Sequence, residues 1–153
     1  MGFHSKTQLK KAKEFGPIPF ECLVDSSIKK PAQYMGQELG VEPKDWTSEQ
    51  FKWVLAYPDL YEVGASNLGH IMLYSILNKI PNQLCDRAYL PDVDLGERLR
   101  ELRVPLFAVE SRRSLASFDI IGFSLGYELG ATNILEMLDL ARIPIHASAR
   151  GDL

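Results

Sequence analysis

Cysteine is scarce in this sequence of 153 residues, because only Cys22 and Cys85 are present and they lie far apart. Two distant thiols exclude a small protein held by disulfides and any cluster with three or four cysteine ligands from this chain. Long apolar runs are also missing, since no stretch approaches the roughly 18 consecutive apolar residues of a membrane helix. No apolar segment follows the charged N-terminus, as a secretory signal would require. We therefore expect a cytoplasmic protein with no membrane partner.

A strong net charge is absent too, since 17 basic and 20 acidic residues leave a formal charge of −3. This balance gives no bulk electrostatic reason to expect nucleic-acid binding, and the short basic run at residues 6–13 is typical of a solvated tail. His4, His70 and His146 have no ligand-like spacing with each other or with the cysteines, so we predict no metal site. We expect His70, at the start of a helix, to face solvent or to take part in the helix cap.

Two parts with different patterns make up the chain. Residues 1–46 are expected to form an irregular extension that wraps the rest, because prolines at positions 17, 19, 31 and 43 interrupt every long helix. Residues 47–153 are expected to form one partial α/β domain, in which strands and helices alternate.

Strands are predicted at 51–57, 85–90 and 118–123, where runs of β-branched, aromatic or apolar residues end at turn signals. The last run is nearly all apolar, which is typical of a strand covered on both faces. Strands that alternate with helices predict a doubly wound, mostly parallel sheet of the flavodoxin or Rossmann-like kind. Such a sheet needs further strands after Ile143, so we interpret this one as incomplete at the C-terminus.

Apolar residues recur at helical spacing between these strands, which predicts three helices that bury one face. Asp94 and Glu97 are a plausible capping box for the second helix. The stripes are Leu73, Ile76, Leu77 and Ile80; Leu95, Leu99 and Leu102; and Ala131, Ile134, Leu135 and Leu138.

The loop at 59–69 is the first candidate for chemistry, because ligands of such sheets bind at the carboxyl ends of the strands. Its small and polar residues would let a ligand approach the backbone and the free amides of the next helix. The alternative interpretation is a capped helix start, with Ser66 or Asn67 as the cap and Gly64 in the turn. Asp59 and Glu62 are either an acid/base pair or partners of a helix dipole. The candidate cofactor-binding residues here are Asp59, Gly64, Ser66, Asn67 and Gly69.

The loop at 124–130 is the second candidate, with Ser124 and Gly126 as its possible cofactor-binding residues. Residues 122–126 match the G-x-S-x-G elbow of serine hydrolases, which raises a hydrolase with Ser124 as nucleophile as an alternative. In that fold the acid and the histidine follow the serine. His146 is the only histidine after it, and no strand pair remains to present it. No H-G-G-G oxyanion loop is present either.

Several segments together resemble an uncharacterised family of radical SAM proteins, in which an N-terminal domain similar to cobalamin-binding domains precedes a radical SAM barrel. The resemblance covers roughly residues 29–150, in order and without large gaps. Its motifs are Lys30-Pro31-Ala32-Gln33-Tyr34-Met35-Gly36, Tyr57-Pro58-Asp59-Leu60-Tyr61-Glu62-Val63-Gly64, Ser66-Asn67-Leu68-Gly69, Glu110-Ser111-Arg112-Arg113 and the stretch 118–139.

The resemblance implies a 4Fe-4S cluster and S-adenosylmethionine in the whole protein, with the cluster held by a C-x-x-x-C-x-x-C motif that this chain lacks. It implies no catalytic residue and no metal ligand here. Cobalamin is a further expectation, from which the sequence departs at two positions. Tyr61 stands where the D-x-H-x-x-G motif has its cobalt-binding histidine, and Gly126 replaces the leucine of S-x-L after Ser124.

The implied function is a cofactor- or substrate-facing module of a radical SAM enzyme, with the barrel of the same protein as its partner. The competing class is a non-catalytic α/β module that only docks a partner domain. Self-association through an open sheet edge at residues 118–125 is a further expectation, because this run includes six residues without charge, 120–125.

Overall fold

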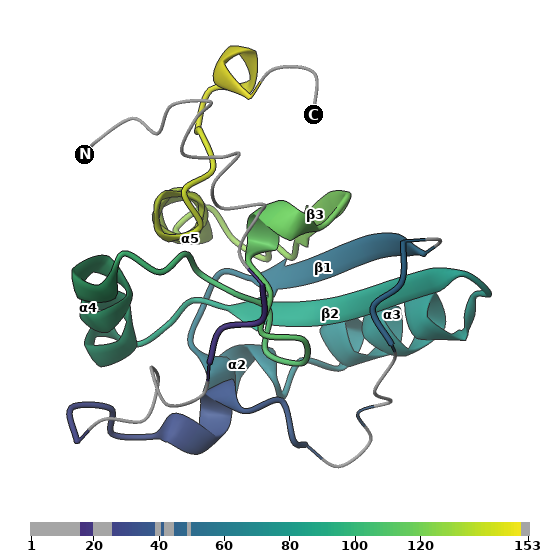
Figure 1. Ribbon diagram of the computed structural model, residues 1–153, viewed down its shortest axis with the longest axis horizontal. Helices are drawn as coiled ribbons and strands as arrows, with labels where there is room; N and C mark the ends of the chain where they lie inside the picture. Colours follow the sequence, from purple (N-terminus) through teal and green to yellow (C-terminus); the bar gives the residue numbers. More distant parts are fainter. Residues whose placement is uncertain (1–15, 20–25, 39–40, 42–44, 49, 151–153) are drawn as a thin grey trace.

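Three parallel strands form a sheet in the computed structural model, which describes residues 16–19, 26–38, 41, 45–48 and 50–150 (Figure 1). The strands are β1 (Phe51–Tyr57), β2 (Gln83–Tyr89) and β3 (Ile120–Phe123), in the order β2-β1-β3. The α-helices of the described residues are α2 (Tyr61–Gly64), α3 (Leu68–Lys79), α4 (Val93–Leu102) and α5 (Gly130–Leu140). Short 3-10 turns are η2 (Pro31–Tyr34), η3 (Leu115–Ser117) and η4 (Ala147–Ala149).

This arrangement confirms the predicted α/β class, with a parallel sheet and helices that follow each strand. The strand order equals the first three positions of the flavodoxin-like order 2-1-3-4-5. All three predicted strands are present. β1 has the predicted bounds, whereas β2 begins two residues earlier and β3 two residues later than predicted.

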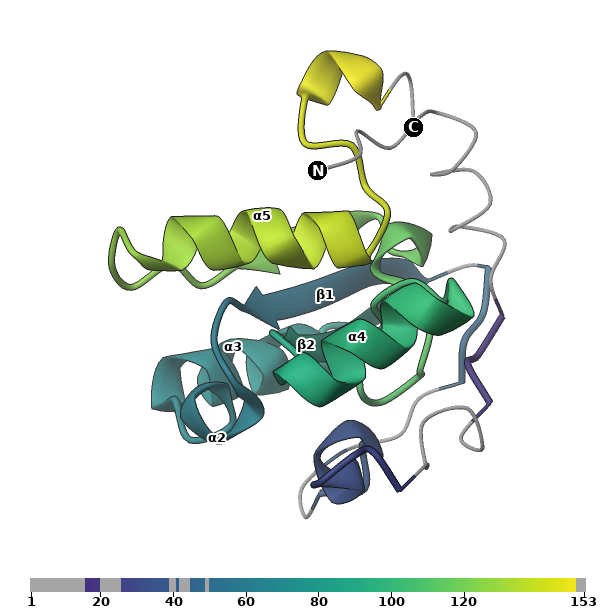
Figure 2. The ribbon, with the colours of Figure 1, turned by 90° about the vertical axis from the view of Figure 1, so that its left-hand side faces the viewer.

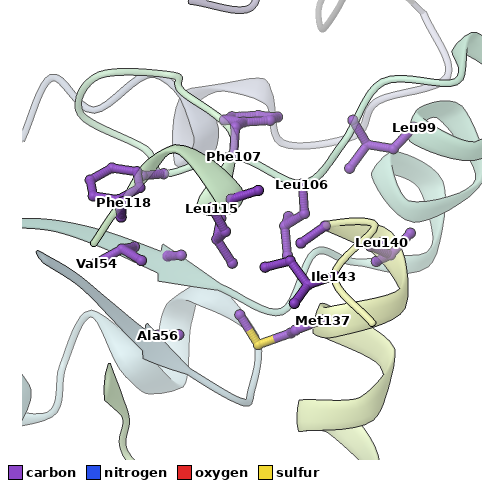
Figure 3. Close-up of a cluster of buried hydrophobic side chains, with 14 of the residues drawn as sticks. Val54, Ala56, Leu99, Leu106, Phe107, Leu115, Phe118, Met137, Leu140 and Ile143 are labelled. Carbon is purple, nitrogen blue, oxygen red and sulfur yellow. The ribbon is translucent and has the colours of Figure 1, made fainter. Parts of the chain in front are cut away.

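Helices cover the two faces of the sheet unequally. Val54 and Ala56 of β1 point into a core shared with α4 and α5, whereas Leu55 points to the opposite face and packs near Tyr74 of α3. Figure 2 shows β1 between α5 and α3. Figure 3 shows the larger core, where side chains of β1, α4 and α5 meet those of the segment between α4 and β3. This segment is a buried irregular stretch with a single bridge from Phe107 to Ser114.

The described part of the N-terminal segment packs directly on the domain. Ile18, Ile28 and Tyr34 belong to the larger core, and the Ile18 amide donates to the Arg112 carbonyl at 2.9 Å. Gly36 has a φ of 62°, and a Cβ there would lie 2.2 Å from the Val109 carbonyl oxygen. Only glycine fits this approach, because it has no Cβ and tolerates positive φ.

The predicted apolar stripe of α3 does not face the core, which corrects the sequence-based prediction. Leu73, Ile76 and Ile80 are exposed, and only Leu77 packs against the smaller core. The side chains that α3 buries are His70, Tyr74 and Asn78. The helical spacing was therefore correct and the choice of buried face was wrong, because the sheet beneath α3 offers polar partners.

The capping box predicted for α4 is also wrong. The helix begins two residues earlier than expected, and the Asp92 carboxylate caps it by accepting from the Val93 amide at 2.7 Å. Asp94 lies in the first turn of the helix, where its Oδ2 accepts from the Lys29 amide at 2.9 Å. Leu95 and Leu99 are buried as predicted, whereas Leu102 is exposed at the helix end.

The strand β3 is the edge of the described sheet, and both its faces are only partly covered. Ile120 is exposed because α3 lies over β1 and β2 rather than over β3. A cavity of about 730 Å³ adjoins the other face, lined by Ile121 and Phe123 of β3 and by Ile134 and Leu138 of α5, among others. The predicted two-sided cover of this strand is therefore wrong for the described chain.

Candidate functional site

The two candidate loops meet at the carboxyl edge of the sheet. One follows β1 and contains α2 before α3 begins, and the other follows β3 and leads into α5. The Asn133 side chain of α5 ties them together by donating to the Pro58 carbonyl at 2.8 Å. This is the edge at which open parallel sheets bind ligands.

Asn67 is the N-cap of α3, as one of the two alternatives predicted. Its carbonyl oxygen accepts from the His70 amide at 3.0 Å, and its amide group donates to the Tyr57 hydroxyl at 3.3 Å. The capped helix start is therefore confirmed, with Asn67 and not Ser66 as the cap. The Ser66 hydroxyl donates instead to the carbonyls of α2.

Of the two roles expected for His70, exposure to solvent is wrong, because 1% of its surface is exposed, whereas its backbone amide does take part in the helix cap. Its Nδ1 lies 3.4 Å from the Oγ of Ser124, and its ring meets the rings of Tyr57 and Tyr89 at centroid distances of 5.5 and 5.7 Å. Burial, together with the nearby Arg87 guanidinium, lowers the pKa of His70 to about 4. The imidazole is therefore neutral near neutral pH.

Two polar atoms in this aromatic cluster are buried without a hydrogen-bond partner, namely His70 Nε2 and the Tyr89 hydroxyl. Unpaired buried polar atoms are rare in folded proteins, and they mark strained or functional places. The sequence analysis did not foresee the contact between His70 and Ser124, because the two residues are 54 positions apart and no local motif joins them.

The two loop carboxylates do not form an acid/base pair. Asp59 accepts from the Leu60 amide at 2.8 Å, and its second oxygen lies 3.5 Å from the Tyr127 hydroxyl. Glu62 instead pairs with Lys30 at 2.5 Å, and this exposed contact lowers the pKa of Glu62 to about 2. Asp59 thus belongs to the carboxyl edge, and Glu62 fastens the N-terminal segment to α2.

The candidate glycines differ in what their missing side chains permit. A Cβ on Gly64 would lie 2.6 Å from the Tyr89 ring, so this glycine allows α2 to pack closely on β2. A Cβ on Gly69 would lie 3.3 Å from the Asn67 cap oxygen. Gly126 has no atom within 4 Å of such a Cβ, and its φ is not positive, so nothing in the described chain requires glycine there.

A buried ion network lies under α2 and α3, and no local pattern in the sequence predicts it. The Arg87 guanidinium pairs with Glu110 at 2.7 Å and with Glu38 at 2.8 Å, and Glu110 also accepts from the Arg87 amide at 2.7 Å. Tyr61 donates to Glu38, and the Arg87 guanidinium lies 4.7 Å from the centroid of the Tyr74 ring. Burial raises the pKa of Glu110, and Arg87 opposes that rise.

One feature of the structure favours the hydrolase alternative and another opposes it: a histidine lies near Ser124, but the backbone at Ser124 is not strained as in a nucleophile elbow. His70, which precedes the serine in the chain, lies 3.4 Å from Ser124, so the histidine near this serine is not the expected His146. A nucleophile elbow, however, sits on a sharp, strained turn. Ser124 is not among the described non-glycine residues with positive φ, and no carboxylate holds His70 Nε2.

Metal ligands are sparse in this part of the chain. The described residues contain no group of three or more His, Cys, Asp or Glu side chains that could hold a metal ion. The Tyr61 hydroxyl is engaged with Glu38, and the buried His70 faces Ser124, so neither offers a ligand to the cobalt of a corrinoid. Cys85 is buried, and burial raises the pKa of its thiol to about 12.

A protein-family model matches a large part of this chain. The model of the family described as radical SAM proteins, N-terminal, matches residues 69–153, which is more than half of the chain. No curated protein and no solved structure shows significant similarity. Among the described residues, no helix is both long enough and apolar enough to cross a membrane.

Proposed function

Because this chain belongs to the family of N-terminal regions of radical SAM proteins, we propose that it is the cofactor- or substrate-facing module of a radical SAM enzyme. The catalytic part of that enzyme would cleave S-adenosylmethionine reductively at a 4Fe-4S cluster whose ligands lie outside this chain. The present residues would hold and orient a ligand beside that reaction.

The observation that supports a ligand site most strongly is the contact between His70 and Ser124. It links the start of α3 to the end of β3, and it leaves the partly exposed Ser124 hydroxyl at the carboxyl edge. Asp59 reaches the same edge through Tyr127, and Asn67 orders the helix start that carries His70. We retain Asp59, Gly64, Ser66, Asn67, Gly69, Ser124 and Gly126 as the proposed cofactor-binding set.

The charges of the two loops favour one class of ligand. Residues 58–69 and 124–130 contain three carboxylates, Asp59, Glu62 and Glu128, and no lysine or arginine. A phosphate group would find no cationic partner in these loops. We therefore propose a neutral or cationic ligand rich in hydrogen-bond donors, such as an amide or an amine. A corrinoid with amide side chains fits this class only without a cobalt ligand from the described residues.

The first test is the chemistry of the radical SAM protein that contains this chain. After anaerobic reconstitution with iron and sulfide and reduction, it should convert S-adenosylmethionine to 5′-deoxyadenosine. Ser124→Ala should weaken ligand-dependent turnover at least tenfold through KM, whereas Thr132→Ala should not, since the Thr132 hydroxyl donates to the Leu129 carbonyl at the start of α5. Absence of a four-iron cluster and of 5′-deoxyadenosine would reject the proposal.

The second candidate function is a non-catalytic docking module. One observation favours it, namely the exposed apolar residues along α3. Under this alternative the protein would still cleave S-adenosylmethionine, but Ser124→Ala would leave both KM and kcat unchanged.

A further inference from the structure

The helix α3 buries polar residues and exposes apolar ones, which is the reverse of an ordinary surface helix. His70, Tyr74 and Asn78 are spaced four residues apart and face the sheet. Leu68, Met72 and Ile76 have the same spacing on the opposite side and are 75%, 62% and 53% exposed. A surface helix of a soluble domain normally places its apolar stripe inward and its polar residues outward.

The inward polar residues are specifically held, so the orientation of α3 is well defined. The Asn78 side chain accepts from the Cys85 amide at 3.0 Å and donates to the Cys85 carbonyl at 2.9 Å. Tyr74 lies against the Arg87 guanidinium, and His70 contacts Ser124. Rotating the helix to bury the apolar stripe would break all of these contacts and would leave buried groups of β2 unpaired.

The outward side has the composition of an interface rather than of a solvated surface. Ile71, Leu73 and Ile80 are also exposed, and Lys79 is the only charged residue in α3. Apolar patches of this kind on a soluble domain mark contact with another domain, a partner or a ligand. Among the described helices, α2 lies beside α3 on this side of the sheet, whereas α4 and α5 lie on the other side (Figure 2).

We propose that the outer face of α3 docks the catalytic domain of the same radical SAM protein. This inference rests on the proposed function and names the surface through which the two parts meet. A tethered domain binds without electrostatic steering, because the linker supplies a high effective concentration. A face with almost no charge suits such a partner better than a freely diffusing one, whose encounter is helped by complementary charge.

The position of α3 gives this docking a consequence for chemistry. Leu68 directly follows the Asn67 cap, so the exposed stripe begins at the carboxyl edge where His70 contacts Ser124. Leu125, Tyr127 and Leu129, in the loop after β3, are exposed as well. A catalytic domain seated on α3 therefore has the candidate ligand site at its border, where a radical formed on it can reach the ligand.

Hydroxyl-radical footprinting of the complete radical SAM protein tests the docking surface on native residues. Val93 of α4 is the control, since it is 70% exposed and Met72 is 62% exposed. At equal exposure a methionine is intrinsically far more reactive than a valine. If α3 is free, Met72 will be oxidised much faster than Val93. Docking predicts that Met72 and Ile76 are modified at least tenfold more slowly than their exposure implies, while Val93 remains fully reactive.

Dilution distinguishes the two partners that could cover the outer face of α3, namely the catalytic domain of the same protein and a second copy of the protein. Protection that persists at the lowest measurable concentration supports the catalytic domain, and protection that disappears on dilution indicates a second copy and overturns the proposal. Met72→Glu with Ile76→Glu should restore oxidation of Leu68 and Ile71, whereas Val93→Glu should not. Rapid oxidation of Met72 in a protein that still forms 5′-deoxyadenosine would reject the docking surface and leave the proposed function intact.

Discussion

His70 Nδ1 lies 3.4 Å from Ser124 Oγ, and this contact joins the start of α3 to the end of β3. The imidazole is buried between two tyrosine rings, whereas the serine is partly exposed. A neutral imidazole can either accept from the serine hydroxyl or donate to it, according to its tautomer. The pair therefore fixes the orientation of a hydroxyl at the place where a ligand of this fold would bind.

The first prediction concerns the reactivity of Ser124. A fluorophosphonate probe should not label it near neutral pH, because His70 is a weak base with a pKa of about 4 and no carboxylate orients its ring. Mass spectrometry after incubation with the probe is the measurement. Labelling that disappears in both Ser124→Ala and His70→Gln would establish a nucleophile–base pair and revive the hydrolase alternative.

The second prediction concerns the pH dependence of folding. The pKa of His70 is lowered from 6.5 to about 4, so the unfolded chain binds its proton first as the pH falls. Stability from this residue is complete above about pH 6.5 and is lost progressively down to about pH 4. Between about pH 7 and pH 5 we expect a loss of about 1 to 2 kcal/mol.

Urea unfolding at these two pH values measures this effect as a difference between proteins, because the carboxylates titrate in all of them. His70→Gln should show a smaller loss than the wild type. Equal pH dependence in the two proteins would show that His70 is not held neutral.

The third prediction concerns the buried ion network. Glu110→Gln should lower the free energy of unfolding by about 3 to 5 kcal/mol, because it leaves the Arg87 charge underpaired in the interior. Glu101→Gln is the control, since Glu101 is exposed and pairs with Arg98 at the surface at 3.6 Å. That change should cost less than about 1 kcal/mol. Similar denaturation midpoints for the two variants would contradict the predicted role of Glu110.

The fourth prediction compares two glycines. Gly36→Ala should destabilise the protein by about 3 kcal/mol or more, since it adds a Cβ at positive φ against the Val109 carbonyl. Gly126→Ala should leave the melting temperature within about 2 °C of the wild type, because the space around it is open. A melt of Gly36→Ala that matches the wild type would mean that the N-terminal segment does not bind as described.

The sequence predicted the strands well, because their signals are local. Apolar and aromatic runs ending at Pro58 and Pro91 place β1 and β2 within two residues. It failed at the cap of α4, where Asp92 and Asp94 are both good candidates. The choice depends on a contact from Asp94 to the distant Lys29.

Long-range partners also explain what was missed at the candidate site. Asn67 was a foreseeable cap, because capping acts over three residues. The burial of His70, and the pairing of Arg87 with Glu110, depend on residues brought together only by the fold. The buried face of α3 was mispredicted for the same reason. Periodicity identifies an apolar stripe, and it does not say whether the sheet or another domain covers it.

The last prediction concerns the free edge of the sheet. Among the described residues β3 pairs only with β1, so one side of its backbone finds no partner amides and carbonyls there, and residues 120–125 carry no charge. Such an edge pairs with other chains unless a charge or proline blocks it. We expect sedimentation velocity of the 153-residue chain to show oligomers. Ile120→Lys should yield monomers, because a lysine on the edge strand opposes pairing. Leu135→Lys on α5 is the control, since Leu135 is 38% exposed and Ile120 37%. It should leave the oligomers unchanged. A wild-type monomer with a cooperative melt would show that this edge is already protected in the chain.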